Sequence, residues 1–562
     1  MPIELVYLAA LLITICIFFI VLKRPIYEGM LAGFIVMLAM TNQWSHAWEF
    51  VYKTSTNTLF YAIVAFMVVA QIFTGTKVID ACVEVVLSIF GRIKGGTGYV
   101  ALLVSSFMGA LSGSAAGNVA ATGVFTIPSM KQSGFPDYLA SNICMASSTM
   151  GNMIPPSGII VASFGILTTL YGDERYAMSQ FWLLMWGISL WFIIQRALTI
   201  FFFCKYHKIQ ALPASQVPRF GDAMRKGWRS MMIPVVILLP FLLDALLKDN
   251  FFTSRLTSAG ASALSGSVLL FTPGIAAVYA LFIIRRSMKV GPKQIAALLQ
   301  KGTKSIVPVA ATIFFAYCIS NLFESLNVGA NIGAMISGWG LGLVPLALII
   351  PLFTAVLGMI LPGSSQVAIF GTAIVSVMAA AGANPFLVAG LLPVICGAME
   401  GMTPSPGPLY VYRHGNLRFR HERNHPELHY LVCPALSAQC PFPHWNHPHA
   451  VGRIGGIGMK KGSQILYQLF GWGAYISIFA GAACFFGFVI ALIIGGGTGA
   501  ALAVMIKGTF FPIIIKLTSV SVALGLIGMY FGKEQALSMT ADKKEAEEDL
   551  KRNLDQAGKK EK

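Results

Sequence analysis

Two segments of the chain contain glycine, serine and amide residues in the same order. Each segment has three motifs. They lie at residues 109–118, 130–134 and 151–155 in the first segment and at residues 358–366, 378–382 and 401–404 in the second. In both, a Gly-Ser cluster precedes an apolar arm, a Met-x-x-x-Gly turn, a second apolar arm and a proline-containing break. About 250 residues separate the two copies, which indicates an internal repeat.

The residue types in these segments suit the binding of ions. Serine hydroxyls, together with backbone carbonyls released where a helix is interrupted, are oxygen ligands for a hard cation, and the N-terminus of a half-helix can face an anion. Paired breaks in corresponding halves of a chain are typical of the binding site of a secondary transporter. The alternative is that small residues only allow close helix packing. Close packing is a sufficient explanation for one such cluster, but two matched clusters that each end in a proline-containing break favour a binding site.

Membrane helices must position these residues, because the composition excludes a soluble protein. Of the 562 residues, 56% are hydrophobic and 11% are charged, and the mean hydropathy is +0.72. An average soluble protein has roughly 25% charged residues. We therefore expect an all-α, multi-pass membrane protein in a lipid bilayer. Candidate spanning helices lie at 4–22, 58–73, 79–91, 177–203, 230–247, 265–284, 305–323, 341–360, 466–494 and 509–530.

The net charge of +17 indicates orientation in the membrane rather than a nucleic-acid partner. Residues 204–229 and 285–304 each carry six lysine or arginine residues, and two candidate spans separate the two loops. Both loops are expected on the cytoplasmic side. No nucleotide-binding loop, Ser-His-Asp pattern or His-Glu metal helix occurs in the sequence, so we expect neither an enzyme nor a bound cofactor.

Three motifs of the first segment resemble one known family. Gly113-Ser-Ala-Ala-Gly-Asn118, Thr126-Ile-Pro-Ser-Met130-Lys131 and Ile154-Pro-Pro-Ser157 look like the large membrane subunit of tripartite ATP-independent periplasmic (TRAP) transporters, and the likeness covers residues 1–411. The resemblance implies a polytopic helical bundle of the bacterial inner membrane, with an inverted-type internal repeat and two re-entrant helical hairpins. It also implies an elevator movement, sodium as the coupling ion, a small organic acid such as a dicarboxylate as substrate, an extracytoplasmic substrate-binding protein and a small membrane subunit.

Two suspected sodium sites follow from this resemblance. The first comprises Ser112, Ser114 and Asn118 with the backbone around Gly151 and Pro155. The second comprises two serines and four backbone positions, namely Gly363, Ser364, Ser365, Gly401, Thr403 and Pro404.

The substrate site is less defined by the sequence. Many family members carry an acidic residue where this chain has Pro362, so an anionic sodium ligand is missing there. Glu400 is either its replacement or a protonated or paired structural glutamate, and the vicinity of Glu400 is the candidate substrate site. Among the arginines, Arg196 alone lies within an apolar run. Snorkelling to the membrane surface explains this position as well as substrate binding does.

The chain changes character after residue 411. Residues 412–458 contain seven of the nine histidines, but the Cys433, Cys440 and His444 spacing is not that of a zinc site, so no transition metal is expected. We interpret this joint as an out-of-frame translation of a lost last membrane helix, to be tested by sequencing the gene. Residues 459–532 then form a two-helix membrane module, and residues 533–562 a charged, solvated tail. The module is a small subunit or a fused accessory protein.

Two other functions remain open at this stage. One is a single-component organic-anion or sodium/proton carrier of the wider ion-transporter group. The other is a channel-like or structural membrane subunit without coupled transport. A carrier requires two matched hairpin sites, whereas a channel requires a continuous polar pore.

Overall fold

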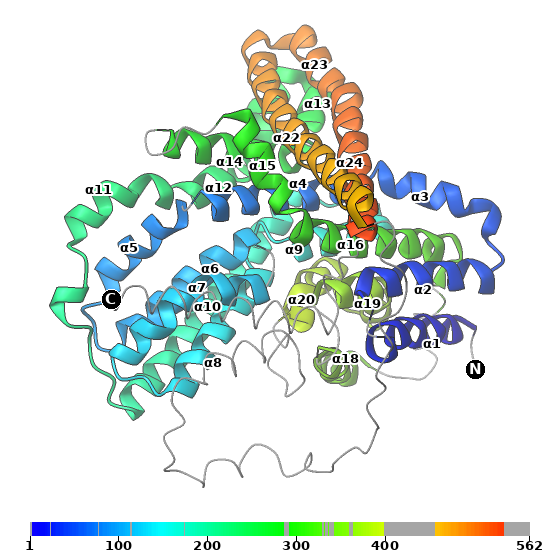
Figure 1. The fold of residues 1–562 in the computed structure, drawn as a ribbon. Helices are drawn as coiled ribbons and strands as arrows, with labels where there is room; N and C mark the ends of the chain where they lie inside the picture. The colour runs from blue at the N-terminus through cyan, green and yellow to red at the C-terminus, as the bar shows by residue number, and fades with distance from the viewer. Residues whose placement is uncertain are drawn as a thin grey trace, which may run out of the picture.

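The computed structural model describes residues 3–22, 24–76, 78–112, 115–172, 175–285, 291–328, 331, 335, 342–358, 363–397 and 456–532, and every regular element in them is helical (Figure 1). This confirms the prediction of an all-α protein. The N-terminal part contains α1 (Ile3–Cys16), the π-turn η1 (Ile17–Val21), α2 (Ile26–Met40), α3 (Ala47–Ser55), α4 (Thr58–Gly75) and α5 (Val78–Phe90).

Five helical stretches of the described residues are long and apolar enough to cross a membrane. Among them are α10 (Met178–Tyr206) and α16 (Thr303–Ser325). The pair Trp44–Ser55 and Thr58–Phe73, bent by 50°, makes a sixth crossing if it is counted as one span. Other apolar helices have only 10–17 residues, fewer than the roughly 20 that a straight crossing needs. Several of these short helices belong to the two motif-bearing segments.

The two motif-bearing segments fold into matching series of helices. The first consists of α6 (Gly96–Ser112), α7 (Ala115–Gln132), α8 (Asp137–Ser148), the 3-10 turn η3 (Thr149–Asn152) and α9 (Gly158–Tyr171). The second consists of α18 (Leu343–Leu357), α19 (Gly363–Ala380) and α20 (Pro385–Gly397). Helix α19 begins and ends 248 residues after α7, and α20 begins 248 residues after α8. The repeat therefore extends to the helix boundaries.

The turns at the ends of α7 and α19 also have the same backbone geometry. Gly134 and Gly382 have φ angles of +94° and +95°. The amide of Phe135 donates to Met130 O at 3.1 Å, and that of Ala383 donates to Met378 O at 2.9 Å. These hydrogen bonds form the Schellman motif, in which a left-handed residue, usually glycine, ends the helix. The Met-x-x-x-Gly pattern thus marks two equivalent helix ends.

The two series are joined through α9. This helix begins after the break of the first series, but it lies against α19 and α20 of the second series and against α4. In Figure 1, α6, α7, α8 and α10 form one group of helices, and α18, α19 and α20 form another. The remaining helices before the C-terminal part are α11 (Phe220–Met231), α12 (Ile233–Leu247), α13 (Thr253–Ser265), α14 (Val268–Ile284), α15 (Pro292–Lys301) and α16.

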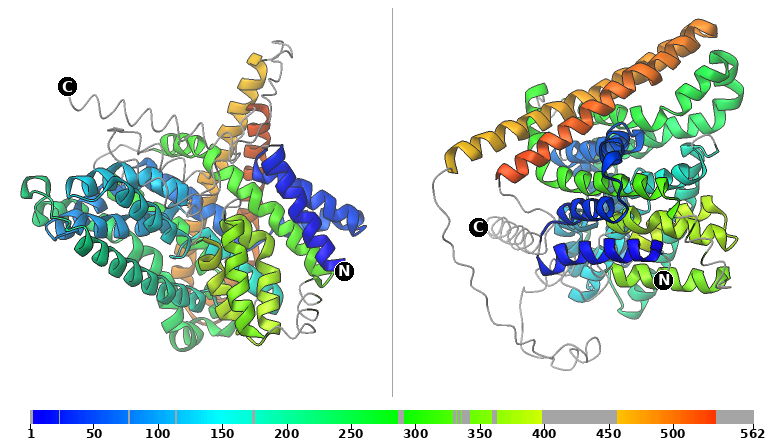
Figure 2. Two further views of the ribbon diagram at one scale, coloured as in Figure 1. Left: turned by 90° about the horizontal axis from the view of Figure 1, so that it is seen from below. Right: turned by 90° about the vertical axis from the view of Figure 1, so that its right-hand side faces the viewer.

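The C-terminal helices pack against this body of the protein. Helix α22 (Gly456–Ile494) runs beside the stretch formed by α23 (Gly496–Met505), the π-turn η7 (Ile506–Phe510) and α24 (Phe511–Gly532) (Figure 2). Helix α22 contacts α14 and α15, and α24 contacts α16. Phe470 and Phe511 belong to the same buried apolar cluster as Phe60. Two long helical stretches therefore lie within residues 456–532, and their assignment to a separate membrane module stays a prediction.

The remaining predicted boundaries stay predictions. Residues 412–455, which include most of the histidine-rich joint, and residues 533–562, the charged tail, lie outside the described residues. The out-of-frame interpretation of the joint is likewise a prediction for gene sequencing.

Candidate ion and substrate site at two helix breaks

Asn118 is the best-defined polar residue of the first predicted sodium site. It lies on α7 and is completely buried. Its Nδ2 atom donates to Ser105 O on α6 at 2.6 Å and to Ser148 O at the end of α8 at 3.2 Å. Its Oδ1 atom is enclosed and has no hydrogen-bond partner among the described residues. A buried amide oxygen without a donor is an open ligand position for a cation or a water molecule.

The first break comprises residues 149–157, between the end of α8 and the start of α9. Glycines allow α6 to lie close to this break. A Cβ atom at Gly109 would lie 2.5 Å from Gly151 Cα and 2.7 Å from Asn118 Nδ2. Since real Cβ atoms do not come so close to backbone, only glycine fits at this crossing. The structure therefore brings Asn118 and Gly151 together, and their role in binding sodium stays a prediction. Pro155 is buried three residues after the end of η3 and is joined to Pro156 by a cis peptide bond.

The second break repeats this arrangement with Gln366, which the sequence-based site did not include. Its Nε2 atom donates to Cys396 O at 3.4 Å, and the residue is completely buried. The offset of 248 relates Gln366 to Asn118 and Cys396 to Ser148. The sequence contained a signal for this role, since Gln366 ends the second Gly-Ser cluster as Asn118 ends the first.

Gly363 lies at the start of α19, where a Cβ atom would be 2.8 Å from Cys396 O and 3.0 Å from Gly397 Cα. Ser364 follows it and is partly buried. Ser112 ends α6, and Ser365 lies in α19, but the side chains of both serines are not described. Ser114, Glu400, Gly401, Thr403 and Pro404 lie outside the described residues. Their predicted roles stay predictions.

The end of α20 lies next to the first break. Asn152, the last residue of η3, donates from Nδ2 to Gly397 O at the end of α20 at 3.5 Å. A Cβ atom at Gly397 would lie 2.8 Å from Asn152 Cβ, so glycine is needed for this approach. The fold thus places the two interrupted helices in one buried region, although 245 residues separate Asn152 and Gly397 in the sequence.

Helix α10 holds the first break with two side chains. Ser189 Oγ donates to Met153 O at 2.7 Å, and Arg196 Nη2 donates to Thr149 Oγ1 at 3.1 Å. Ser189 and Arg196 are seven residues apart, which places them on one face of the helix. Arg196 therefore points into the protein and does not snorkel to the membrane surface.

The ion pairs of the described residues lie elsewhere. They join Arg24 to Glu28, Lys53 to Glu324 and Lys131 to Asp137. In the described part of the chain, no group of three or more His, Cys, Asp or Glu residues is arranged to hold a metal ion. Among the described residues, the oxygen atoms near the first break and the end of α20 belong to amide, hydroxyl and carbonyl groups, which suit a hard cation better than a transition metal.

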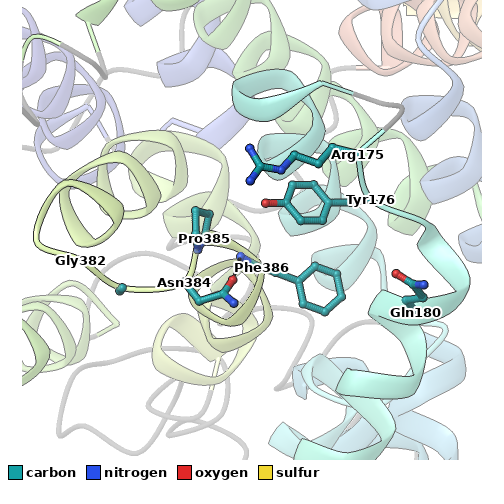
Figure 3. Close-up of a pocket in the computed structure, with 8 residues that line it drawn as sticks. Arg175, Tyr176, Gln180, Gly382, Asn384, Pro385 and Phe386 are labelled. Atoms are coloured by element: carbon teal, nitrogen blue, oxygen red, sulfur yellow. Dashed lines mark hydrogen bonds between the residues drawn. The ribbon is translucent and has the colours of Figure 1, made fainter.

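A large open pocket lies away from the breaks (Figure 3). It has a volume of about 600 Å³ and lies between the connection from α9 to α10 and the turn from α19 to α20. The Arg175 guanidinium lies 5.7 Å from the centre of the Tyr176 ring, which stacks on Phe386. This pocket adjoins the start of α20, whereas the second break adjoins its end, 13 residues or about 20 Å further along. We therefore do not assign the coupling site to it.

Comparisons with known proteins agree with this architecture. The family model for the DctM component of the tripartite ATP-independent periplasmic transporter matches residues 5–412. The C4-dicarboxylate TRAP transporter large permease protein DctM of Pseudomonas aeruginosa is 25% identical over 301 residues, which are 52% of this chain and 62% of that protein. The sialic acid TRAP transporter large permease protein SiaM of Vibrio cholerae is 22% identical over 215 residues, 38% of this chain and 46% of that protein. The chain thus spans about half the length of these relatives.

Among solved structures, Neisseria gonorrhoeae MtrF, from a class of antimetabolite efflux pumps, matches with a TM-score of 0.50 and 14% identity. The match covers 77% of this chain and 82% of that one, and it shows a shared fold. The family match covers well over half of the chain, and the family is one of multi-pass bacterial membrane permeases, not of enzymes. The chain belongs to the family of DctM components of tripartite ATP-independent periplasmic transporters.

Proposed function

We propose that this chain is the permease subunit of a sodium-coupled secondary transporter that imports a small organic acid delivered by an extracytoplasmic binding protein. The observation that carries the proposal is a matched pair of contacts: at the ends of α8 and α20, a buried amide side chain donates to one of the last carbonyls of the helix, and the end of α20 lies against the first break. The relatives named for C4-dicarboxylates and sialic acid support a carboxylic acid as substrate.

Two re-entrant hairpins are part of this proposal. The first consists of α6 and α7, with 17 and 18 residues, and the second of α18 and α19, with 15 and 18 residues. Each arm is shorter than the roughly 20 residues of a full crossing. We propose that the hairpins enter from opposite sides of the membrane, as an inverted repeat requires, and that they move together against the remaining helices in an elevator movement.

Sodium is the proposed coupling ion at both breaks. At the first break, Asn118 Oδ1 is an open oxygen ligand close to the end of α8. The end of a helix carries a partial negative charge on its unsatisfied carbonyl groups, which favours a bound cation. The first sodium site therefore combines Asn118 Oδ1 with backbone carbonyls of the break. The second site combines Ser364 with backbone near Gly397, while Gln366 holds the end of α20 in place.

The proposed partners are an extracytoplasmic binding protein and a small membrane subunit. Residues 459–532 are either this small subunit in fused form or an accessory membrane protein. These residues pack on α14, α15 and α16, which are not part of the two motif-bearing segments. This packing supports a place for them in the stationary part of the transporter.

Uptake into proteoliposomes tests the proposal. Radiolabelled succinate and sialic acid are offered with an inward or a collapsed sodium gradient, with and without a cognate binding protein. We expect uptake only with both the gradient and the binding protein. Uptake that needs the gradient alone supports the single-component carrier. Uptake that needs neither, with a rate proportional to concentration, supports the channel-like subunit.

A further inference from the structure

Arg196 carries a positive charge deep within a membrane helix. Helix α10 has 29 residues and is therefore about 43 Å long, whereas the hydrocarbon core of a bilayer is about 30 Å thick. Arg196 lies ten residues, or about 15 Å, before the end of the helix at Tyr206. The neighbouring Ile194 and Leu198 are 47% and 54% exposed and form the outer face of the helix. Arg196 instead turns inward to the first break.

The guanidinium of Arg196 is only partly satisfied. Nη2 donates to Thr149 Oγ1 at 3.1 Å, and this hydroxyl in turn donates to Ala146 O at 2.9 Å. Nη1 is fully enclosed and has no hydrogen-bond partner in the part of the chain that the structure describes. None of the ion pairs between described residues includes Arg196. A buried cation without a counter-ion is unfavourable in a membrane interior, and such residues usually have a functional partner.

We propose that Nη1 of Arg196 binds a carboxylate beside the first break. A guanidinium presents its N–H groups in a planar fork that matches a carboxylate, and Thr149 already fixes one side of this fork. Asn118 donates to Ser148 O, and Arg196 donates to the side chain of the next residue, Thr149. Two adjacent residues, Ser148 and Thr149, thus contact one side chain with an unpaired acceptor, Asn118 Oδ1, and one with an unpaired donor, Arg196 Nη1. The proposed carboxylate at Nη1 then lies on the same side of the break as the proposed sodium ligand.

Two sources can supply this carboxylate. The first is the transported acid, and this assignment rests on the proposed function. The second is a glutamate of the chain itself. The offset of 248 relates Glu400 to Asn152 of the first break, so Glu400 is the glutamate that the experiment must separate from the substrate. Arg196 binds a carboxylate in both cases.

Thermal unfolding of the purified full chain in detergent tests the inference without any transport step. The melting temperature is measured against increasing succinate, sialic acid or pyruvate, at constant ionic strength in chloride. The variants are Arg196→Gln, Arg196→Lys and Glu400→Gln. Arg225→Gln is the control for loss of charge, because Arg225 is exposed on α11. Ser189→Ala measures the effect of a weaker contact between α10 and the first break without loss of charge, because it removes the hydrogen bonds from Ser189 Oγ to Met153 O and Met185 O.

If the transported acid is the source, at least one acid raises the melting temperature of the wild type. In that case, Arg196→Gln weakens the apparent affinity for this acid about tenfold or more, and Arg196→Lys weakens it less. Arg225→Gln leaves the affinity unchanged, and Ser189→Ala weakens it less than Arg196→Gln does. If Glu400 is the source, the acids have no effect on the wild type. The Arg196→Gln and Glu400→Gln variants then lose equal stability, and the double variant loses no more than either one.

Two results overturn the inference. One is an equal response of the wild type to chloride and to the acids, which identifies an unspecific anion site. The other is the absence of any acid response together with additive effects of the Arg196 and Glu400 substitutions. Because these measurements involve no sodium gradient and no binding protein, their failure leaves the proposed transport function standing, and failed uptake leaves the carboxylate site standing.

Discussion

Asn118 and Gln366 make the same hydrogen bond in the two halves of the chain. Asn118 Nδ2 donates to Ser148 O at 3.2 Å, and Gln366 Nε2 donates to Cys396 O at 3.4 Å. The two donor residues, Asn118 and Gln366, are 248 positions apart, and so are the two acceptor residues, Ser148 and Cys396. Each bond ties the start of a hairpin arm to the last residues of the following half-helix. The repeat therefore preserves a specific contact as well as an order of helices.

Replacement of Asn118 by alanine should weaken sodium binding. The substitution removes the open Oδ1 ligand and both Nδ2 hydrogen bonds. We expect the sodium concentration for half-maximal uptake to rise about tenfold, equivalent to about 1.4 kcal/mol. Asn321→Ala is a suitable control, because Asn321 bonds to Thr54 on α3 and lies outside both breaks. Equal sodium dependence in Asn118→Ala and the control would exclude Asn118 as a ligand.

Replacement of Gly109 by alanine should disrupt the first break without unfolding the helices. The new Cβ atom would lie 2.5 Å from Gly151 Cα, and backbone cannot move aside as a flexible side chain can. We expect sodium-driven uptake to fall more than tenfold, with unchanged helical content by circular dichroism. Gly187→Ala on α10 introduces a methyl group into open space and should retain wild-type uptake. If both variants transport equally well, the crossing of α6 and η3 is not part of the site.

The turn glycines should respond equally to substitution. Gly134 and Gly382 have φ angles of +94° and +95°, and a Cβ atom at either would contact nothing. An alanine there introduces backbone strain alone, which should lower the free energy of unfolding by about 1 kcal/mol at each position. Thermal unfolding of Gly134→Ala and Gly382→Ala should show similar decreases in melting temperature. Gly221→Ala, also in open space but without a positive φ, should show none. Clearly unequal decreases would argue against equivalent turns.

The C-terminal helices should loosen when Arg255 is replaced by glutamine. Arg255 on α13 donates from Nε to Leu492 O at 2.9 Å and from Nη2 to Ile493 O at 2.6 Å. These carbonyls end α22, where a positive charge contributes up to about 1 kcal/mol. Hydrogen exchange at the end of α22 should become about fivefold faster in Arg255→Gln and stay unchanged in Arg225→Gln. Equal exchange in both variants would show that Arg255 does not hold this helix end.

Much of the fold could be predicted because its signals are local. Apolar runs marked α10 and α16, and the Met-x-x-x-Gly pattern marked the ends of α7 and α19, because a left-handed helix end favours glycine. The contacts between distant segments could not be predicted. Asn152 meets Gly397 only because α9 lies against α19 and α20, and no local pattern encodes that packing.

The candidate site was likewise predicted in part. Asn118 and Gly151 lie together as expected, because hairpin and break are close in sequence. Gln366 could not be singled out from the second cluster alone, because the neighbouring serines offer equally suitable oxygen ligands. Its role follows from its equivalence to Asn118 in the repeat. Arg196 points inward because it donates to Thr149, which lies in η3 and is distant in the sequence. The sequence alone therefore could not distinguish an inward arginine from one that snorkels to the membrane surface.

The most direct test of the central claim is the simultaneous measurement of sodium and organic-acid fluxes in proteoliposomes that contain the full chain and its binding protein. We predict that radiolabelled sodium enters together with the acid in a fixed ratio, and that an imposed outward acid gradient drives sodium out. Acid uptake that continues at an unchanged rate without sodium flux would contradict a sodium-coupled transporter.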